Sequence, residues 1–403
     1  MKINIIKNIA FTSVFVMTAT TASAATIGDD FNLKLSPASN GMGGVGYISP
    51  QDAVASVYGN PASLTQLEGD TDFTFGATYL NVRNKGSAES SALGAEWSGD
   101  IEFEHYLLPS IAFRQRVSDK LVLGGGVQVI SGLGSDYRSR NALQPTVTYL
   151  NFGANAAAGY QLTPKTSIGA TVTLSYALLE LGLVSNTAMQ EDMGVRAGLG
   201  IIHDFGPVKA GINYNSELAL KFDNVIRSAP APGNMSDVDL EQPQEVILGI
   251  SSTPALWKDV LLEANFIYKN WENADLHKDL WKDTYTLQLG GQYAVNNKLK
   301  LRAGYSYTTD LLKENDLGNS IGGVTSLDAG GEVPISPTVI QFVQSFADPY
   351  WNNHVTLGLG YQLTDTLGVD VHTSYAWGPD QTIGSNEIEV GVYSLGAGLT
   401  WNF

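Results

Sequence analysis

The five histidines of this 403-residue chain are the side chains best suited to acid–base or metal chemistry (His105, His203, His277, His354 and His372). No two of them have the spacing by which one face of a helix binds zinc. A hydrolase would also need a serine and a histidine within hydrogen-bonding reach. Cysteine is absent, which excludes a disulfide scaffold and a thiolate metal site. The sequence therefore predicts no catalytic residue, no metal site and no cofactor, and His354 and His372 are expected at strand ends.

The composition excludes nucleic acid as a partner. The formal net charge is −17, whereas phosphate binding needs an excess of Lys and Arg. Glycine accounts for 43 of the 403 residues, and 18 tyrosines and 7 tryptophans are also present. Acidic loops could bridge to lipopolysaccharide through divalent cations, or they could simply be solvated.

The N-terminus has the three parts of a secretory signal peptide. Lys2 and Lys7 form a basic start, residues 9–17 are largely apolar, and Ala22-Ser23-Ala24 fits the small-x-small cleavage rule. The apolar part is shorter than the roughly 20 residues of a spanning helix. We expect residues 1–24 to be removed on export. The alternative is the N-terminal helix of a cytosolic protein.

Apolar and polar residues alternate in segment after segment of the remaining chain. In residues 354–363, every second side chain is apolar, so these side chains share one face of a strand (Val355, Leu357, Leu359, Tyr361 and Leu363). The stretches 168–178, 285–293 and 299–307 follow the same period of two, which is typical of a β-strand with one apolar face. The segments run for about ten residues, as tilted membrane strands do, and short and long connections alternate between them.

These features predict an all-β protein, a transmembrane antiparallel β-barrel of about 14 strands spanning residues 69–403. The strands are expected to begin near Asp72, Ile101, Leu121, Thr146, Thr166, Asp192, Val208, Gln244, Asp259, Lys282, Lys298, Trp351, Leu367 and Ile388. The final strand ends at Phe403. A terminal aromatic residue resembles the signal that such barrels present to the barrel-assembly machinery. Outer-membrane lipid and lipopolysaccharide are the other expected partners of a Gram-negative, multi-pass outer-membrane protein.

Residues 25–68 precede the barrel and do not alternate. A glycine-rich stretch at 40–46 is followed by a short predicted helix, for which Ser49 and Pro50 are suitable as N-cap and first residue and Asp52 lies in the first turn. A segment of this length suits a plug, or hatch, inside the barrel. An ordered periplasmic tail is the alternative.

Three stretches resemble the FadL/TodX-type outer-membrane transporters of fatty acids and aromatic hydrocarbons. They are residues 39–46 with Asn60-Pro61-Ala62 after them, residues 281–307, and residues 353–361. The resemblance implies a fourteen-stranded barrel with a hatch in its lumen. It also implies that a hydrophobic small molecule is captured by external loops, bound beside the hatch and released sideways through a gap at a kinked third strand.

The resemblance also suggests where the site residues lie. Gly124, Gly125 and Gly126 in the third strand are the candidate lateral gate, because consecutive glycines favour a bulge; close packing is the alternative. Asn60, Pro61 and Ala62 are the candidate hatch anchor, or an ordinary surface turn. Carboxylate binding would need a cation near the ligand (candidates His277, Lys278, Lys282, Lys300 and Arg302).

The long loop 309–349 contains apolar residues that could capture ligand (Ile340, Phe342, Val343 and Phe346) or pack against the barrel rim. A general or gated diffusion porin for polar solutes is the main rival function. A porin would have an open lumen lined by facing charges, whereas the expected inner face is mostly Gly, Ser, Thr and Gln. A purely structural or adhesive barrel is a further alternative.

Overall fold

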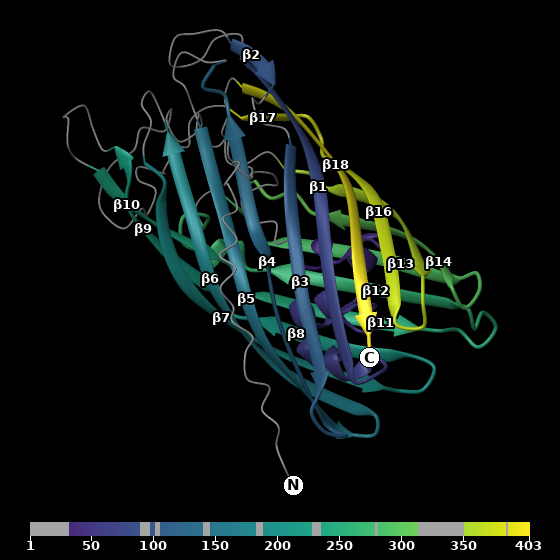
Figure 1. Ribbon diagram of the computed structural model, residues 1–403. Helices are drawn as coiled ribbons and strands as arrows, with labels where there is room; N and C mark the ends of the chain where they lie inside the picture. The colour runs from purple at the N-terminus through teal and green to yellow at the C-terminus, as the bar shows by residue number, and fades with distance from the viewer. Residues whose placement is uncertain are drawn as a thin grey trace.

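Fourteen strands of the computed structural model pair edge to edge and close into a barrel, because β18 pairs with both β16 and β1 (Figure 1). The structure describes residues 32–88, 97–100, 105–139, 146–182, 188–227, 235–278, 281–312, 350–383 and 386–403. The expected signal peptide lies outside these residues. All neighbouring strands are antiparallel, as predicted from the short turns and long loops.

The barrel strands begin within four residues of the predicted starts. They are β1 (Thr71–Ala88), β3 (His105–Arg116), β4 (Leu121–Asp136), β5 (Thr146–Thr163), β6 (Thr166–Gly182), β7 (Gln190–Asp204), β8 (Lys209–Asn215), β11 (Glu245–Ser252), β12 (Val260–Lys269), β13 (Thr284–Ala294), β14 (Leu299–Thr308), β15 (Asn353–Gln362), β16 (Leu367–Trp377) and β18 (Asn386–Asn402).

Four further strands lie at the end of the barrel that carries the long loops, which we call the loop side. Two short ones, β2 (Trp97–Asp100) and β17 (Gln381–Ile383), pair with β1 and β18. Residues 222–243, where the alternation of connections predicts one of the long polar loops, contain most of a separate hairpin, β9 (Leu218–Arg227) with β10 (Met235–Gln242). Its apolar residues alternate with polar ones, so one face of the hairpin is buried in a hydrophobic cluster.

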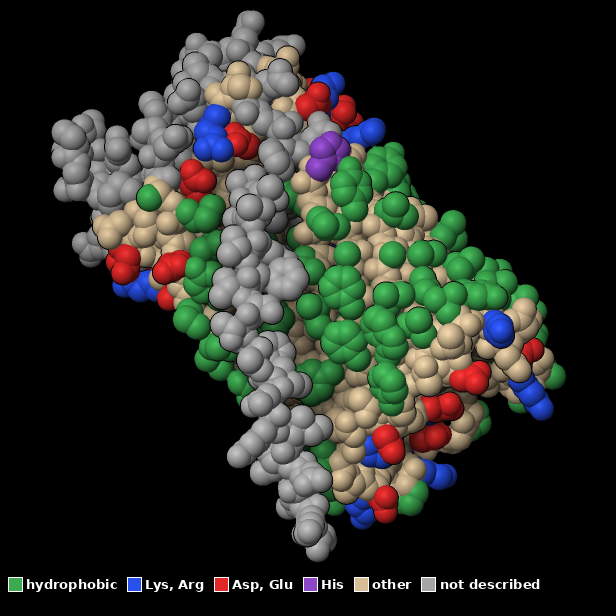
Figure 2. Space-filling view, in the orientation of Figure 1, with side chains coloured by type: hydrophobic (Ala, Val, Ile, Leu, Met, Phe, Trp, Pro, Cys, Tyr) green, Lys and Arg blue, Asp and Glu red, His purple; other side chains and the backbone are tan. Residues whose placement is uncertain are grey.

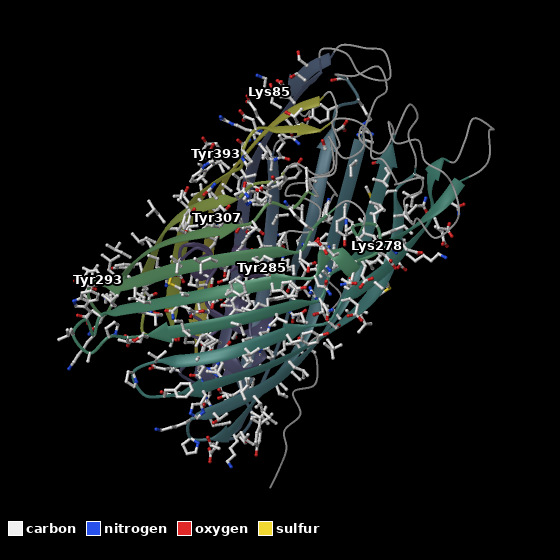
Figure 3. The ribbon with its side chains drawn as sticks, turned by 180° about the vertical axis from the view of Figure 1, so that it is seen from behind. Lys85, Lys278, Tyr285, Tyr293, Tyr307 and Tyr393 are labelled. Carbon is white, nitrogen blue, oxygen red and sulfur yellow. The ribbon has the colours of Figure 1, made fainter. Side chains whose placement is uncertain are left out.

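The outer wall is apolar and meets lipid. Exposed and buried positions alternate along the strands, as in β3. Hydrophobic side chains form a broad band over the barrel wall, and charged side chains gather toward its two ends (Figure 2). Tyrosines lie toward both borders of the wall: Figure 3 places Tyr293 close to the short turns and Tyr307 and Tyr393 nearer the loops. This is the aromatic girdle of an outer-membrane barrel.

We expect an arginine at the centre of this band to destabilise the barrel strongly. The Leu357 side chain is 62% exposed at the middle of β15. Leu357→Arg should lower the free energy of unfolding by about 2–4 kcal/mol, measured by urea unfolding in lipid vesicles, because the charge is moved into hydrocarbon. The matched variant Leu363→Arg lies beside a short turn and should cost about 0–1 kcal/mol. Equal losses for the two variants would contradict this assignment of the membrane position.

The segment before β1 contains four short helices that lie inside the barrel (Figure 1). They are η1 (Asn32–Leu35), α1 (Pro37–Asn40), α2 (Ala53–Tyr58) and η2 (Pro61–Gln66); a fifth, η3 (Trp271–Asn273), follows β12. None of the described helices is long and apolar enough to cross a membrane. Helix α2 starts later than predicted from Ser49 and Pro50, because the Asp52 carboxylate accepts the Ala55 N–H at 2.7 Å and is the N-cap.

Candidate functional site

The candidate site is the barrel lumen around the N-terminal residues 33–66. This segment meets every one of the fourteen barrel strands, through helix packing, hydrogen bonds or close backbone approach. At one side, the Gly43 N–H donates to Thr356 Oγ1 on β15 at 2.8 Å. At the other, the Tyr58 hydroxyl donates to the Gly153 carbonyl oxygen on β5 at 2.9 Å. The barrel cross-section at this level is therefore occupied by protein.

Glu263 on β12 is the main polar anchor of the segment. Its carboxylate is buried and accepts backbone N–H groups from Gly46 at 2.8 Å, Ile48 at 3.1 Å and Ser49 at 2.9 Å. Hydrogen bonds to a charged group are stronger than those between neutral groups, so this one carboxylate fixes the turn that leads into α2.

Asn60 and Pro61 dock the end of the segment on the wall at β6 and β8. The Asn60 side chain accepts the Ala62 N–H at 3.0 Å and donates to the Ile212 carbonyl oxygen on β8 at 3.1 Å. Pro61 packs on β6 so closely that a Cβ at Gly169 would lie 2.3 Å from the Pro61 carbonyl carbon. The Asn-Pro-Ala turn thus both starts η2 and contacts the barrel, and it is fully buried.

Two cavities lie between the N-terminal segment and the wall formed by β12–β16, β18 and β1. One is open to solvent and has a mixed polar and apolar lining that includes Tyr47, Ile267 and Gln288. The second is more apolar, with Leu35, Leu80 and Val392 in its lining. Lys34, Trp351 and His354 line both cavities, so the two are adjacent.

The charged groups of these cavities are cationic. Lys34 contributes to both, and its Nζ lies 5.6 Å from the centre of the Trp351 ring. Lys269 contributes to the first cavity and pairs with the buried Glu245 at 3.4 Å. Neither lining includes an Asp or Glu, in a chain whose net charge is −17. Because Glu245 already pairs with Lys269, Lys34 is the cation that an anionic ligand would meet in these cavities.

The cations predicted from the sequence lie elsewhere. His277 is buried in the loop after β12, stacked 4.1 Å from Trp281, and burial lowers its pKa to about 3, so the ring is neutral at physiological pH. Lys278 pairs with Asp275 at 3.0 Å near the loop end (Figure 3). Lys282 is half-buried, and its backbone N–H donates to Leu311.

The two predicted cations on β14 do not line the cavities either. Arg302 is buried and forms an ion pair with Asp370, and its Nε donates to Gln292 Oε1 at 2.8 Å. Lys300 is exposed two residues further toward the short turn.

The three glycines of β4 lie in a regular ladder rather than in a bulge. Gly124, Gly125 and Gly126 pair with Arg114, Phe113 and Ala112 of β3 without interruption. A Cβ at Gly124 would lie 2.9 Å from both Leu64 and Val57 of the N-terminal segment. Gly124 and Gly126 therefore allow the segment to approach the wall, whereas a Cβ at Gly125 would meet the Phe113 ring.

Beyond the glycines, toward the long loops, the pairing between β3 and β4 ends. Among the described residues, the two strands pair only as far as Ser110 with Gln128, although β3 starts at His105 and β4 continues to Asp136. β3 stays paired with β1, and β4 stays paired with β5. The β4–β5 register shifts between Val129 and Ser131, which leaves Ile130 as a bulged residue.

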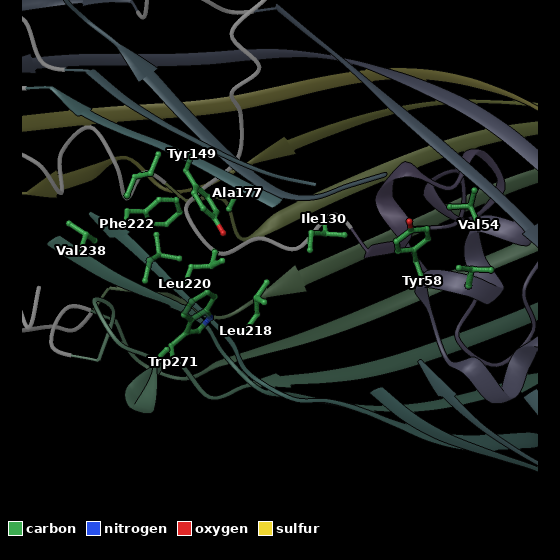
Figure 4. Close-up of a cluster of buried hydrophobic side chains, with 14 of the residues drawn as sticks. Val54, Tyr58, Ile130, Tyr149, Ala177, Leu218, Leu220, Phe222, Val238 and Trp271 are labelled. Atoms are coloured by element: carbon green, nitrogen blue, oxygen red, sulfur yellow. The ribbon is translucent and has the colours of Figure 1, made fainter. Parts of the chain in front are cut away.

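Ile130 joins two ends of one hydrophobic cluster. The cluster runs from α2, with Val54 and Tyr58, through Ile130 to the β9–β10 hairpin and Trp271 at the loop side (Figure 4). The strand break therefore lies beside an apolar path that connects the loops with the N-terminal segment.

Sequence reasoning missed several residues of this lumen. His354 lies at the start of β15 as expected, but it faces the lumen and lines both cavities. His372, also expected at a strand end, lies in the middle of β16, with Nε2 2.8 Å from Asn40 Nδ2. Nothing in the sequence distinguishes Lys34 and Glu263 from the other charged residues. The predicted capture residues Ile340, Phe342, Val343 and Phe346 lie outside the described residues.

Comparison with known proteins identifies the family. The family model described as outer membrane protein transport protein (OMPP1/FadL/TodX) matches residues 14–235, more than half of the chain. No curated protein matches the sequence.

Three solved structures share the fold. The toluene transporter TodX of Pseudomonas putida is 18% identical with a TM-score of 0.64, covering 95% of this chain and 99% of that one. A FadL homologue of Pseudomonas aeruginosa is 13% identical with a TM-score of 0.69, over 94% and 100%. The toluene transporter TbuX of Ralstonia pickettii is 17% identical with a TM-score of 0.64, over 93% and 100%. The chain is a multi-pass barrel of the outer membrane and belongs to the OMPP1/FadL/TodX family of transport proteins.

Proposed function

We propose that this protein is a passive outer-membrane transporter of hydrophobic small molecules, in which residues 25–68 are the hatch that closes the lumen. The observation that carries the proposal is the lumen filled by the buried residues 33–66. Among the described residues, a lumen filled in this way differs from the open, polar lumen that a diffusion porin needs. An apolar molecule gains by returning to hydrocarbon without crossing water.

The exit route that we propose is the separation of β3 and β4. We place the gate at the bulge beside Ile130, four residues beyond the predicted glycine triplet, because the ladder between the strands ends at Ser110 and Gln128. The apolar cluster that includes Ile130 leads to this position from the loops. A ligand in the cluster would then move sideways into the membrane.

Conductance separates this function from a diffusion porin. The purified protein in planar bilayers should show no steady conductance, because the hatch closes the lumen. A variant lacking residues 25–65 should conduct ions. Steady conductance by the intact protein would favour a polar pore.

The cationic cavities support a carboxylate-bearing ligand as one class of cargo. Its apolar part would lie along Leu35, Leu80 and Val392, with its carboxylate toward Lys34. Neutral aromatic hydrocarbons, the cargo named for the toluene transporters above, would use the apolar lining alone.

We expect Lys34→Met to weaken laurate binding by roughly 10- to 100-fold, since a hydrogen bond to a charged group contributes about 1.5–3 kcal/mol. Binding of 1-dodecanol should stay unchanged, because it has the same chain without the charge. Isothermal titration calorimetry in nanodiscs measures both. Lys120→Met, in an exposed turn, is the matched control and should leave laurate binding unchanged. Equal losses for laurate and dodecanol would show that Lys34 is not a carboxylate ligand.

A further inference from the structure

The β9–β10 hairpin is outside the barrel ladder, yet it contacts the wall at the β4 bulge. Gln242, the last residue of β10, donates from Nε2 to Ser131 Oγ at 2.8 Å. Ser131 follows the bulged Ile130 directly. The same Nε2 lies 3.3 Å from the Tyr149 hydroxyl on β5. One amide thus joins a loop hairpin to the two wall strands beside the break.

These polar groups are deeply buried. Ser131 and Tyr149 are 0% exposed and Gln242 is 1% exposed. The network continues from Tyr149 to Asn151, whose Nδ2 lies 3.1 Å from the hydroxyl, and on to Ser175 at 2.6 Å. A buried amide that loses its partners pays the full cost of desolvation. Gln242 therefore holds β10 and β4 in one relative position.

The surroundings of this contact are apolar and belong to the proposed ligand path. Leu218, Leu220 and Phe222 of β9 share one hydrophobic cluster with Ile130 and Tyr58 (Figure 4). A hydrophobic molecule that enters under the hairpin must displace packed side chains, because protein interiors have few voids. A shift of the hairpin moves Gln242 relative to Ser131.

We propose that Gln242 is a positioning residue that couples the β9–β10 hairpin to the wall break: ligand entry beneath the hairpin breaks its bond to Ser131 and frees β4 beside β3. The inference rests on the proposed function, since it assumes a ligand that passes along this cluster. Gln242 is then the residue through which the arrival of a ligand at the loops affects the wall. The bond holds β4 in its present position beside the break, so its loss shifts the equilibrium toward a wider break.

A reversible cross-link tests the coupling, and the absence of cysteine from the chain makes it specific. The variant Ser131→Cys/Gln242→Cys is joined with a bifunctional methanethiosulfonate and released with dithiothreitol. Uptake of radiolabelled oleate and toluene by cells is measured in both states. Cross-linking should lower uptake at least tenfold, and release should restore it. The pair Thr163→Cys/Thr166→Cys, whose hydroxyl groups lie 3.0 Å apart at an exposed turn, controls for the reagent.

A second variant separates the coupling from a purely structural role. Gln242→Leu should raise the maximal uptake rate about fivefold, as expected from the loss of one buried hydrogen bond that stabilises the closed state. A structural role alone would lower the rate. Amide hydrogen exchange of residues 129–136 should become faster in this variant, while exchange of residues 121–128 stays unchanged.

The outcomes separate the two proposals. Unchanged uptake after cross-linking, or unchanged exchange of residues 129–136 in Gln242→Leu, overturns the coupling and leaves the transport function intact. If the unmodified protein takes up neither oleate nor toluene, the transport function fails and the coupling fails with it.

Discussion

Replacement of Glu263 by alanine is expected to release the N-terminal segment from the barrel wall. Three N–H groups lose their acceptor, those of the buried Gly46 and Ile48 and of the half-buried Ser49. Each unsatisfied buried donor costs about 1–3 kcal/mol, and 1.4 kcal/mol is a tenfold change in an equilibrium. Amide exchange at these three positions should accelerate by at least tenfold, and ion conductance should appear in planar bilayers.

The matched variant Glu263→Gln keeps one acceptor oxygen and loses the charge. It should show an intermediate acceleration of exchange and little conductance. If Glu263→Ala leaves exchange at residues 46–49 at the rate of the unmodified protein, the carboxylate does not anchor the segment. Side-chain packing alone would then hold the N-terminal segment in the lumen.

A single methyl group at Gly169 is expected to unseat the Asn60-Pro61 turn. A Cβ at this position would lie 2.3 Å from the Pro61 carbonyl carbon and 2.5 Å from the Ala62 nitrogen. Both are backbone atoms, which cannot swing away as a side chain can. Gly169→Ala should therefore lower the free energy of unfolding by about 1–3 kcal/mol, the usual cost of overpacking, measured by urea unfolding in lipid vesicles.

The control is another strand glycine, at which the closest atom to a new Cβ belongs to a side chain that can move. A Cβ at Gly291 would come no closer than 3.3 Å, to the tip of the Leu262 side chain. Gly291→Ala should leave stability nearly unchanged. Equal behaviour of the two variants would mean that η2 does not press on β6 as the structure shows.

The barrel could be predicted from sequence because its determinants are local and repeated. Each strand alternates apolar and polar residues for about ten positions, so fourteen independent segments indicate the same architecture. The hairpin in the loop 222–243 was missed because β10 is mostly polar, with Ser, Asp, Glu or Gln at five of its eight positions. Its apolar residues Leu218, Leu220 and Phe222 become informative only when their buried partners are known.

The lumen could be predicted only in outline, because its contacts join residues far apart in the chain. Glu263 lies more than 200 positions after the N–H groups that it accepts, and Gln242 lies 111 positions after Ser131. No local pattern marks such pairs. The glycine triplet at 124–126 was noticed for its composition, yet the bulge lies at Ile130, which has no unusual neighbours in sequence.

The predicted cations show the same limit. His277 was a candidate because of its place in the chain, but two tryptophans bury it and keep it neutral. Lys34 has only ordinary residues around it in the sequence. It lines both cavities because the N-terminal segment folds back into the barrel.

Uptake of radiolabelled oleate and toluene by cells with and without this protein tests the central claim most directly. The account predicts that at least one of the two enters faster only when the intact protein is present. It also predicts that the variant lacking residues 25–65 loses this selectivity and admits small sugars. No acceleration by the intact protein for either compound, together with sugar entry through it, would contradict the claim and favour a polar pore.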